Sequence, residues 1–173
     1  ITARVANEKS IKETNERFQA IARATSDAIY DFDFITNKAY ITGSNYHALF
    51  GYVFENHTTD IDFFKSCLHP DDRDRVYTFL DNTVVSPENN HFEIEYRLIK
   101  RDGSYADVLD RFNILWSNGY PVRKVGAMQD ITTRKFQETI LALEKEIYEL
   151  NADPKVSFSE VVEKLVTSIE ILI

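Results

Sequence analysis

Hydrophobic and polar side chains alternate most strictly over residues 92–98. Four apolar residues there are separated by charged ones: Phe92, Ile94, Tyr96 and Leu98. This period of two predicts a half-buried β-strand. The Asp-Gly step at positions 102–103 predicts a hairpin turn into a second strand over residues 105–116. A further turn at 117–121 leads to a third strand, 122–128, so this region is predicted to be an antiparallel meander.

The preceding part of the chain shows shorter patterns. Alternation over residues 28–34 predicts a strand, and residues 39–42 predict a second one. A brief helix at 45–50 is expected to end at Gly51, because glycine readily takes a left-handed conformation. Residues 54–62 are expected to form a loop. His69 and Pro70 indicate a helix start, since proline suits the first helical position, and this helix should end near residue 82.

The two ends of the chain have helical patterns. Residues 1–25 lack Gly and Pro and carry a thin apolar stripe, which predicts a helix that packs on one side, either on its own sheet or on a second copy. After residue 133, apolar residues recur at spacings of 4, 3, 4 and 3: Phe136, Ile140, Leu143, Ile147 and Leu150. This spacing is typical of a coiled-coil seam and predicts a homodimer. A second helix is expected to begin at Ser157.

Composition narrows the classes of function. The chain has 173 residues, is 43% hydrophobic and carries a net charge of −8, so it can bury a core but is unsuited to nucleic acid or direct membrane contact through charge. Its single cysteine, Cys67, excludes an intrachain disulfide and fits the cytoplasm. The apolar last residues and the first residue, Ile1, suggest a piece of a longer polypeptide.

The sequence offers no catalytic or metal-binding constellation. Its five glycines are never closer than seven residues apart, which excludes phosphate-binding loops and esterase elbows. The four histidines have no spacing that would place two on one helix face. No catalytic residue and no metal ligand is therefore predicted.

Asp110 is the exception in the second strand of the meander. It shares the parity of Val108 and Phe112, so a regular strand would point its carboxylate inward, where burial is costly without a partner. Three explanations stay open: a local bulge turns it outward, it pairs with Arg111 or Arg97, or it is a pocket group that meets a ligand.

Several short runs follow one another along the chain. They are Glu95-Tyr96-Arg97-Leu98, Lys100-Arg101-Asp102-Gly103-Ser104, Val108-Leu109-Asp110, Gly126 and Asp130-Ile131-Thr132 with Arg134-Lys135, preceded by Leu49-Phe50-Gly51-Tyr52 and His69-Pro70-Asp71-Asp72-Arg73. Their order and spacing resemble a PAS domain with its C-terminal PAC motif. The resemblance implies an α+β PAS fold, with a five-stranded antiparallel sheet in the order 2-1-5-4-3, helices on one face and flanking terminal helices. It also implies a PAS domain at residues 18–133, after a linker helix at 1–17.

The residues beyond this domain are assigned by the same resemblance. Residues 134–153 match a signalling helix, and residues 154–173 are similar to the entry helix of a GAF domain. The resemblance further implies that Asp130, Ile131 and Thr132 form the signal junction between the last strand and that helix. The chain lacks the Asn-Cys-Arg-Phe run of flavin-binding members and the helix histidine of haem-binding members. No cofactor is therefore expected.

The expected function is non-catalytic signal transduction in a bacterial sensor, such as a histidine kinase or a cyclase. The domain would pass the binding of an unidentified small molecule or a partner to a downstream output domain of the same polypeptide. Two alternatives remain at this point. One is a ligand-free PAS spacer that only dimerises, and the other is a small α+β enzyme.

Overall fold

The computed structural model describes residues 20, 24–152, 157, 159, 161–163 and 166–167. The predicted linker helix at 1–17, and most of the module predicted at 154–173, lie outside the described residues. The chain divides into two compact units, Ile1–Ile131 and Thr132–Ile173.

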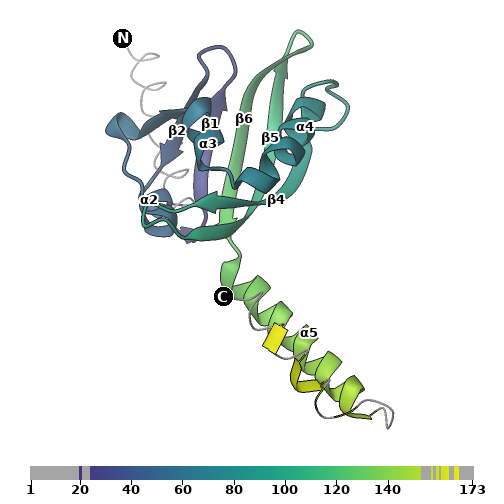
Figure 1. Ribbon diagram of the computed structural model, residues 1–173. Helices are drawn as coiled ribbons and strands as arrows, with labels where there is room; N and C mark the ends of the chain where they lie inside the picture. Colours follow the sequence, from purple (N-terminus) through teal and green to yellow (C-terminus); the bar gives the residue numbers. More distant parts are fainter. Residues whose placement is uncertain are drawn as a thin grey trace, which may run out of the picture. The chain divides into compact units, whose positions relative to one another are not determined.

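The first unit is built on one antiparallel sheet (Figure 1). Its six strands are β1 (Ala28–Asp33), β2 (Lys38–Thr42), β3 (Thr58–Asp60), β4 (His91–Ile99), β5 (Tyr105–Ser117) and β6 (Tyr120–Asp130). Their order across the sheet is β3-β2-β1-β6-β5-β4. The first strand thus lies beside the last one, and β5 and β6 form the long central hairpin.

The prediction of five strands in the order 2-1-5-4-3 is wrong in number and in order. The sixth strand, β3, lies within the predicted loop at 54–62 and pairs with β2 at the edge of the sheet, with Lys38 opposite Asp60 and Tyr40 opposite Thr58. Three residues are too few to show a period of two. Backbone pairing with β2, rather than a side-chain pattern, defines this strand.

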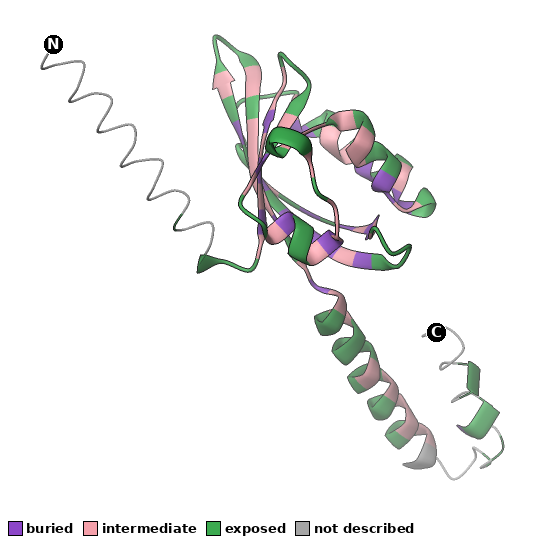
Figure 2. Ribbon diagram, turned by 90° about the vertical axis from the view of Figure 1, so that its left-hand side faces the viewer, coloured by how far each residue is buried: buried purple, intermediate pink, exposed green. Residues whose placement is uncertain are grey.

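Three helices connect β2 to β4: α2 (Asn45–Phe50), α3 (Ile61–Cys67) and α4 (Arg73–Thr83). Gly51 ends α2 with a φ of 80°, as its sequence position predicted. The core lies where these helices meet the inward-facing residues of the strands, and Figure 2 shows buried positions on both. The largest fully buried apolar side chains of this core are Phe50, Phe112, Leu68, Leu98 and Ile114.

The His-Pro-Asp-Asp run anchors α4 to β4. Pro70 begins a short 3-10 turn that precedes the helix, as predicted, and the His69 N–H donates to the carbonyl of Arg97 at 2.9 Å. The Asp72 carboxylate accepts from Arg97 three times: from its backbone N–H at 2.9 Å, from Nε at 3.0 Å and from Nη2 at 3.2 Å. These hydrogen bonds lower the pKa of Asp72 from 3.8 to about 2.

The second unit contains α5, which spans Thr132–Ala152. It begins two residues before the predicted start at 134. Four of the five predicted seam residues are partly buried, namely Ile140, Leu143, Ile147 and Leu150, whereas Phe136 is 52% exposed. Whether the seam joins two chains stays a prediction.

The Asp72 interaction gives the stability of the fold a defined dependence on pH. Because the folded-state pKa lies below the unfolded value, the carboxylate stabilises the fold at neutral pH. This contribution is lost as the pH falls through 3.8 towards 2. Asp72→Asn should therefore lower the free energy of unfolding at pH 7 and have a much smaller effect near the acid end of this range. Urea denaturation at both pH values measures the difference.

Asp71→Asn is the matched control, because Asp71 is the neighbouring carboxylate but its side chain is 75% exposed. It should change stability little at either pH. A loss at Asp72 that is the same at both pH values would contradict the assignment.

Candidate functional site

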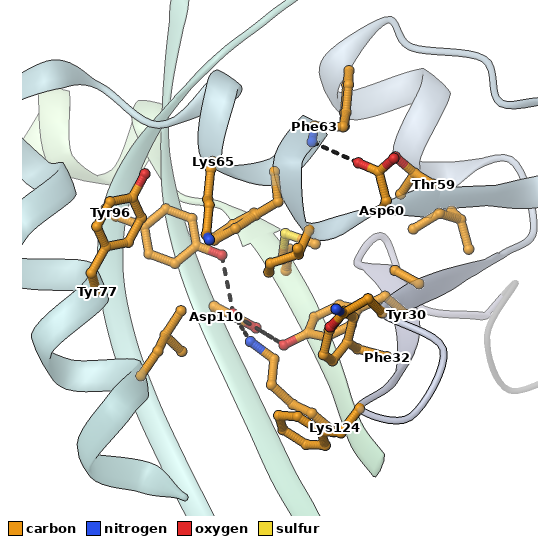
Figure 3. A pocket seen from close by; sticks show the side chains of 18 of the residues that line it. Tyr30, Phe32, Thr59, Asp60, Phe63, Lys65, Tyr77, Tyr96, Asp110 and Lys124 are labelled. Carbon is orange, nitrogen blue, oxygen red and sulfur yellow. Dashed lines mark hydrogen bonds and ion pairs between the residues drawn. The ribbon is translucent and has the colours of Figure 1, made fainter. Parts of the chain in front are cut away.

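A cavity of about 460 Å³ lies between the sheet and helices α3 and α4 (Figure 3). This volume falls within the range of roughly 300–1,000 Å³ that is usual for small-molecule sites. The lining is mainly apolar, with a group of polar side chains from the strands. Its residues are Tyr30, Phe32, Phe34, Asn37, Ala39, Ile41, Tyr46, Thr59, Asp60, Ile61, Phe63, Phe64, Lys65, Tyr77, Leu80, Asp81, Val84, Tyr96, Asp110, Lys124 and Met128.

Asp110 lies at the centre of the polar group. Strand β5 is regular at this position, so the period of two that buries Val108 and Phe112 also turns Asp110 inward, where it is 1% exposed. The Tyr30 hydroxyl donates to its two carboxylate oxygens at 2.9 and 3.1 Å, and the Tyr96 hydroxyl donates to Oδ2 at 3.1 Å. The buried carboxylate is thus hydrogen-bonded by side chains from β1 and β4.

Lys124 supplies the opposite charge from β6. Its Nζ lies 3.6 Å from Asp110 Oδ2, and its side chain is 13% exposed. The ammonium also faces the rings of Phe112 at 4.2 Å, Tyr30 at 5.1 Å and Phe64 at 6.0 Å, measured to the ring centroids. Aromatic faces at these distances attract a cation and partly offset the cost of its burial. Figure 3 shows Tyr30, Tyr96 and Lys124 converging on Asp110.

Gly126 is required by this arrangement. It lies on β6 opposite Tyr30 of β1 and Phe112 of β5. A Cβ at this position would be 2.6 Å from the Tyr30 hydroxyl oxygen and 2.8 Å from Cβ of Phe112. Only glycine therefore leaves room for Tyr30 to cross β6 and reach Asp110.

Burial shifts the pKa of every ionisable group in the cluster. It raises the pKa of Asp110, although Lys124 and the two tyrosine donors oppose the shift. It lowers the pKa of Lys124 against the attraction of the carboxylate. The pKa values of Tyr30 and Tyr96 are raised well above 10.0, first by burial and then by Asp110. Both phenols therefore remain protonated and act as donors at neutral pH.

Two of the three explanations for Asp110 are wrong. The register shift between β5 and β6 falls at Leu115 and Trp116, so no bulge turns Asp110 outward. Arg111 pairs instead with Glu93 at 2.6 Å, and Arg97 pairs with Asp72. Asp110 lines the cavity, and whether it meets a ligand stays a prediction.

The sequence interpretation missed the partners of Asp110. Lys124 shares the inward parity of Gly126 and Met128 on the third strand of the meander. A charged residue on an inward-facing parity is the signal that led to Asp110, and the same test would have found Lys124. The two tyrosine hydroxyls gave no such signal, because a buried tyrosine is common in a core.

The predicted junction residues follow one another at the boundary of the two units. Asp130 ends β6, and its carboxylate pairs with Lys100 Nζ at 2.9 Å. Ile131 is 3% exposed, and its N–H donates to the Asp107 carbonyl on β5 at 2.8 Å. Thr132 is the first residue of α5. The signalling role of the three residues stays a prediction.

Other chemistry is sparse in the part of the chain that the structure describes. No group of three or more His, Cys, Asp or Glu residues there could hold a metal ion. Cys67 is buried with a free thiol, and burial raises its pKa. Among the described helices, none is long and apolar enough to cross a membrane.

A family model described as the PAS fold matches residues 41–128, about half of the chain. The chain therefore belongs to the PAS fold family, which confirms the resemblance seen in the sequence. No curated protein matches it.

Solved structures agree with this assignment. A sensory box histidine kinase/response regulator from Burkholderia thailandensis is 29% identical, with a TM-score of 0.61, and the match covers 75% of this chain and 95% of that one. The N-terminal domain of a diguanylate cyclase with PAS/PAC sensor from Marinobacter aquaeolei is 23% identical, with a TM-score of 0.55 and coverages of 63% and 98%. A PAS domain of an HTR-like protein from Haloarcula marismortui is 22% identical, with a TM-score of 0.53 and coverages of 72% and 98%. At 23% and 22% identity, the structures from Marinobacter aquaeolei and Haloarcula marismortui show that the fold is shared and nothing more.

The coupling of Asp110 and Lys124 can be measured by a double-mutant cycle. Lys124→Met leaves a buried carboxylate without its cation and should lower the free energy of unfolding by about 3–5 kcal/mol. Adding Asp110→Asn should restore a large part of this loss, because no buried charge then remains unpaired. Chemical denaturation of the three variants measures the cycle.

Arg111→Met is the matched control, since it breaks an ion pair with Glu93 on the exposed face of β5 and β4. It should cost less than about 1 kcal/mol. If the double variant were as unstable as the sum of its two single variants, Asp110 and Lys124 would not be coupled.

Proposed function

We propose that this chain is a non-catalytic sensory domain that passes a binding event in its cavity to an output domain through α5. The observation that carries the proposal is the buried Asp110–Lys124 pair in a cavity large enough for a small molecule. A buried ion pair usually stabilises a core less than apolar side chains of similar volume would. It does, however, provide polar groups to which a ligand can bind. The similarity to a sensory box histidine kinase/response regulator supports the same assignment.

The strands that hold the pair lead directly to the junction. Lys124 and Asp130 lie on β6, six positions apart, and both point to the inner side of the sheet. Asp110 lies three residues from Asp107, whose carbonyl accepts a hydrogen bond from the N–H of Ile131. A ligand that shifts Lys124 or Asp110 therefore acts on the two strands that meet at Ile131, the residue before α5.

The same proposal includes a homodimer in the cytoplasm. In the single chain, α5 leaves large apolar side chains open to water: Phe136 at 52% exposure, Leu141 at 63% and Tyr148 at 75%. A continuous apolar stripe is a common sign of a protein–protein contact, and the seam spacing places exposed Phe136 at one end of such a stripe. The single cysteine, buried and reduced, fits the cytoplasm.

Light scattering at micromolar concentration should give the mass of a dimer. Phe136→Glu should shift the protein towards the monomer, because it places a charge in the apolar contact. Gln137→Glu is the control: it adds the same charge at the next exposed position and should leave the dimer intact. A wild-type mass of one chain that does not change on concentration would refute the dimer.

The junction is tested in a full-length protein that carries this chain and its output domain. Asp130→Ala and Thr132→Ala should uncouple the output from the stimulus, leaving it constantly on, constantly off or unresponsive. Each substitution removes a side-chain interaction worth about 1 kcal/mol, too little to unfold a domain of roughly 5–15 kcal/mol stability. Lys100→Met should act like Asp130→Ala, because it removes the partner of that carboxylate.

Gln129→Ala, on the neighbouring exposed position of β6, is the control and should respond like the wild type. If the three junction variants also responded within error of the wild type, the coupling role would be lost. The chain would then be better described as a ligand-free dimerisation spacer.

A further inference from the structure

The Lys124 ammonium has hydrogen-bonding capacity that the described residues leave unused. An ammonium group carries three donors. In the part of the chain that the structure describes, its one polar side-chain contact is Asp110 Oδ2 at 3.6 Å, and its other contacts are ring faces. This contact engages at most one of the three donors, so the others must find acceptors in the cavity, which water or a polar group of a ligand can supply.

The Asp110 carboxylate, in contrast, already has its hydrogen-bonding partners. Its two oxygens already accept three hydrogen-bond contacts from Tyr30 and Tyr96, and its charge is balanced by Lys124. The carboxylate is thus satisfied without a donor from the ligand. The polar group of the ligand should therefore accept a hydrogen bond rather than donate one.

The charge of the lining distinguishes neutral acceptors from anionic ones. Two cations, Lys65 and Lys124, and three carboxylates, Asp60, Asp81 and Asp110, line the cavity and leave one net negative charge. A carboxylate ligand would add a second negative charge close to the buried Asp110 and would lose its own hydration. A carbonyl oxygen accepts the same hydrogen bond without either cost.

The remaining lining determines the shape of the ligand. Eight of the 21 lining residues are aromatic, and they come from both the sheet and the helices: Tyr30, Phe32, Phe34, Tyr46, Phe63, Phe64, Tyr77 and Tyr96. Aromatic walls bury flat ring systems well, through stacked and edge-to-face contacts. The apolar part of the ligand is thus expected to be a planar ring system.

We propose that the cavity binds an uncharged aromatic molecule with a carbonyl oxygen, which accepts a hydrogen bond from Lys124. This inference rests on the proposed sensory function and names the chemical class of its ligand. Asp110 acts as a positioning residue, because it holds the ammonium in place between the rings. Since Lys124 lies on β6, occupation of the cavity is transmitted to the strand that ends at Asp130.

Three probes that share one ring system test the proposal: 2-acetylnaphthalene, naphthalene and 2-naphthoate. Titration of the full chain, followed by nuclear magnetic resonance, gives the three dissociation constants and the residues that respond. The ketone should bind about tenfold more tightly than the hydrocarbon, as expected for a hydrogen bond from a charged donor. It should also bind more tightly than the carboxylate.

Substitutions then identify the donor. Lys124→Met should abolish the preference for the ketone over naphthalene while naphthalene binding persists. The charge-compensated double variant Asp110→Asn/Lys124→Met answers the same question if the single variant does not fold. Lys65→Met, which removes the other cation of the lining, should keep the preference.

Other outcomes overturn the inference. Equal affinities for the three probes, tightest binding of 2-naphthoate, or an unchanged ketone preference in the Lys124 variants would show that Lys124 does not select a neutral carbonyl. These results would leave the cavity a ligand site and the sensory function intact. Binding of none of the probes would also refute the inference. The sensory function is judged separately by the junction variants, whose readout uses none of these compounds.

Discussion

The buried carboxylate of Asp110 is the constraint on which the rest of the domain depends. Its charge is tolerable only because β1, β4 and β6 each contribute a partner, namely Tyr30, Tyr96 and Lys124. Four of the six strands must therefore be in register before this group is satisfied. An apolar residue at this position would have made a simpler core. The cluster instead ties the packing of the sheet to a polar site that faces a cavity.

A second carboxylate, Asp72, joins a helix to the sheet. Asp72 joins the start of α4 to the backbone and the guanidinium of Arg97 on β4, and so fixes the helix that forms one wall of the cavity. The two contacts differ in surroundings. Asp72 is 9% exposed, and its hydrogen bonds lower its pKa, whereas Asp110 is 1% exposed, and burial raises its pKa despite its partners. Hydrogen bonds dominate at the first carboxylate and desolvation at the second.

The sequence predicted the elements whose side chains alternate over many residues. Residues that are close in sequence determine each of these features: the β4-β5-β6 meander, the helix start at Pro70 and the helix end at Gly51. The short strand β3 was missed because it depends on pairing with Lys38–Thr42, a non-local backbone interaction. For the site, parity identified Asp110 as unusual, but its partners come from three strands. Parity within β6 marks Lys124 as a second inward-facing charge, but it does not show that the fold brings Lys124 next to Asp110.

The central position of the first strand has a consequence for biosynthesis. Strand β1 pairs with β2 soon after both are made, but its other edge stays open until β6 arrives, with Ala28 opposite Met128. The Tyr30–Asp110 contact likewise joins residues 80 positions apart. Non-local pairing of this kind is slow, because a long loop must close first. During translation the ribosome must therefore release nearly the whole domain before its sheet can close, and until then the growing chain presents an unpaired strand edge to the chaperones around it.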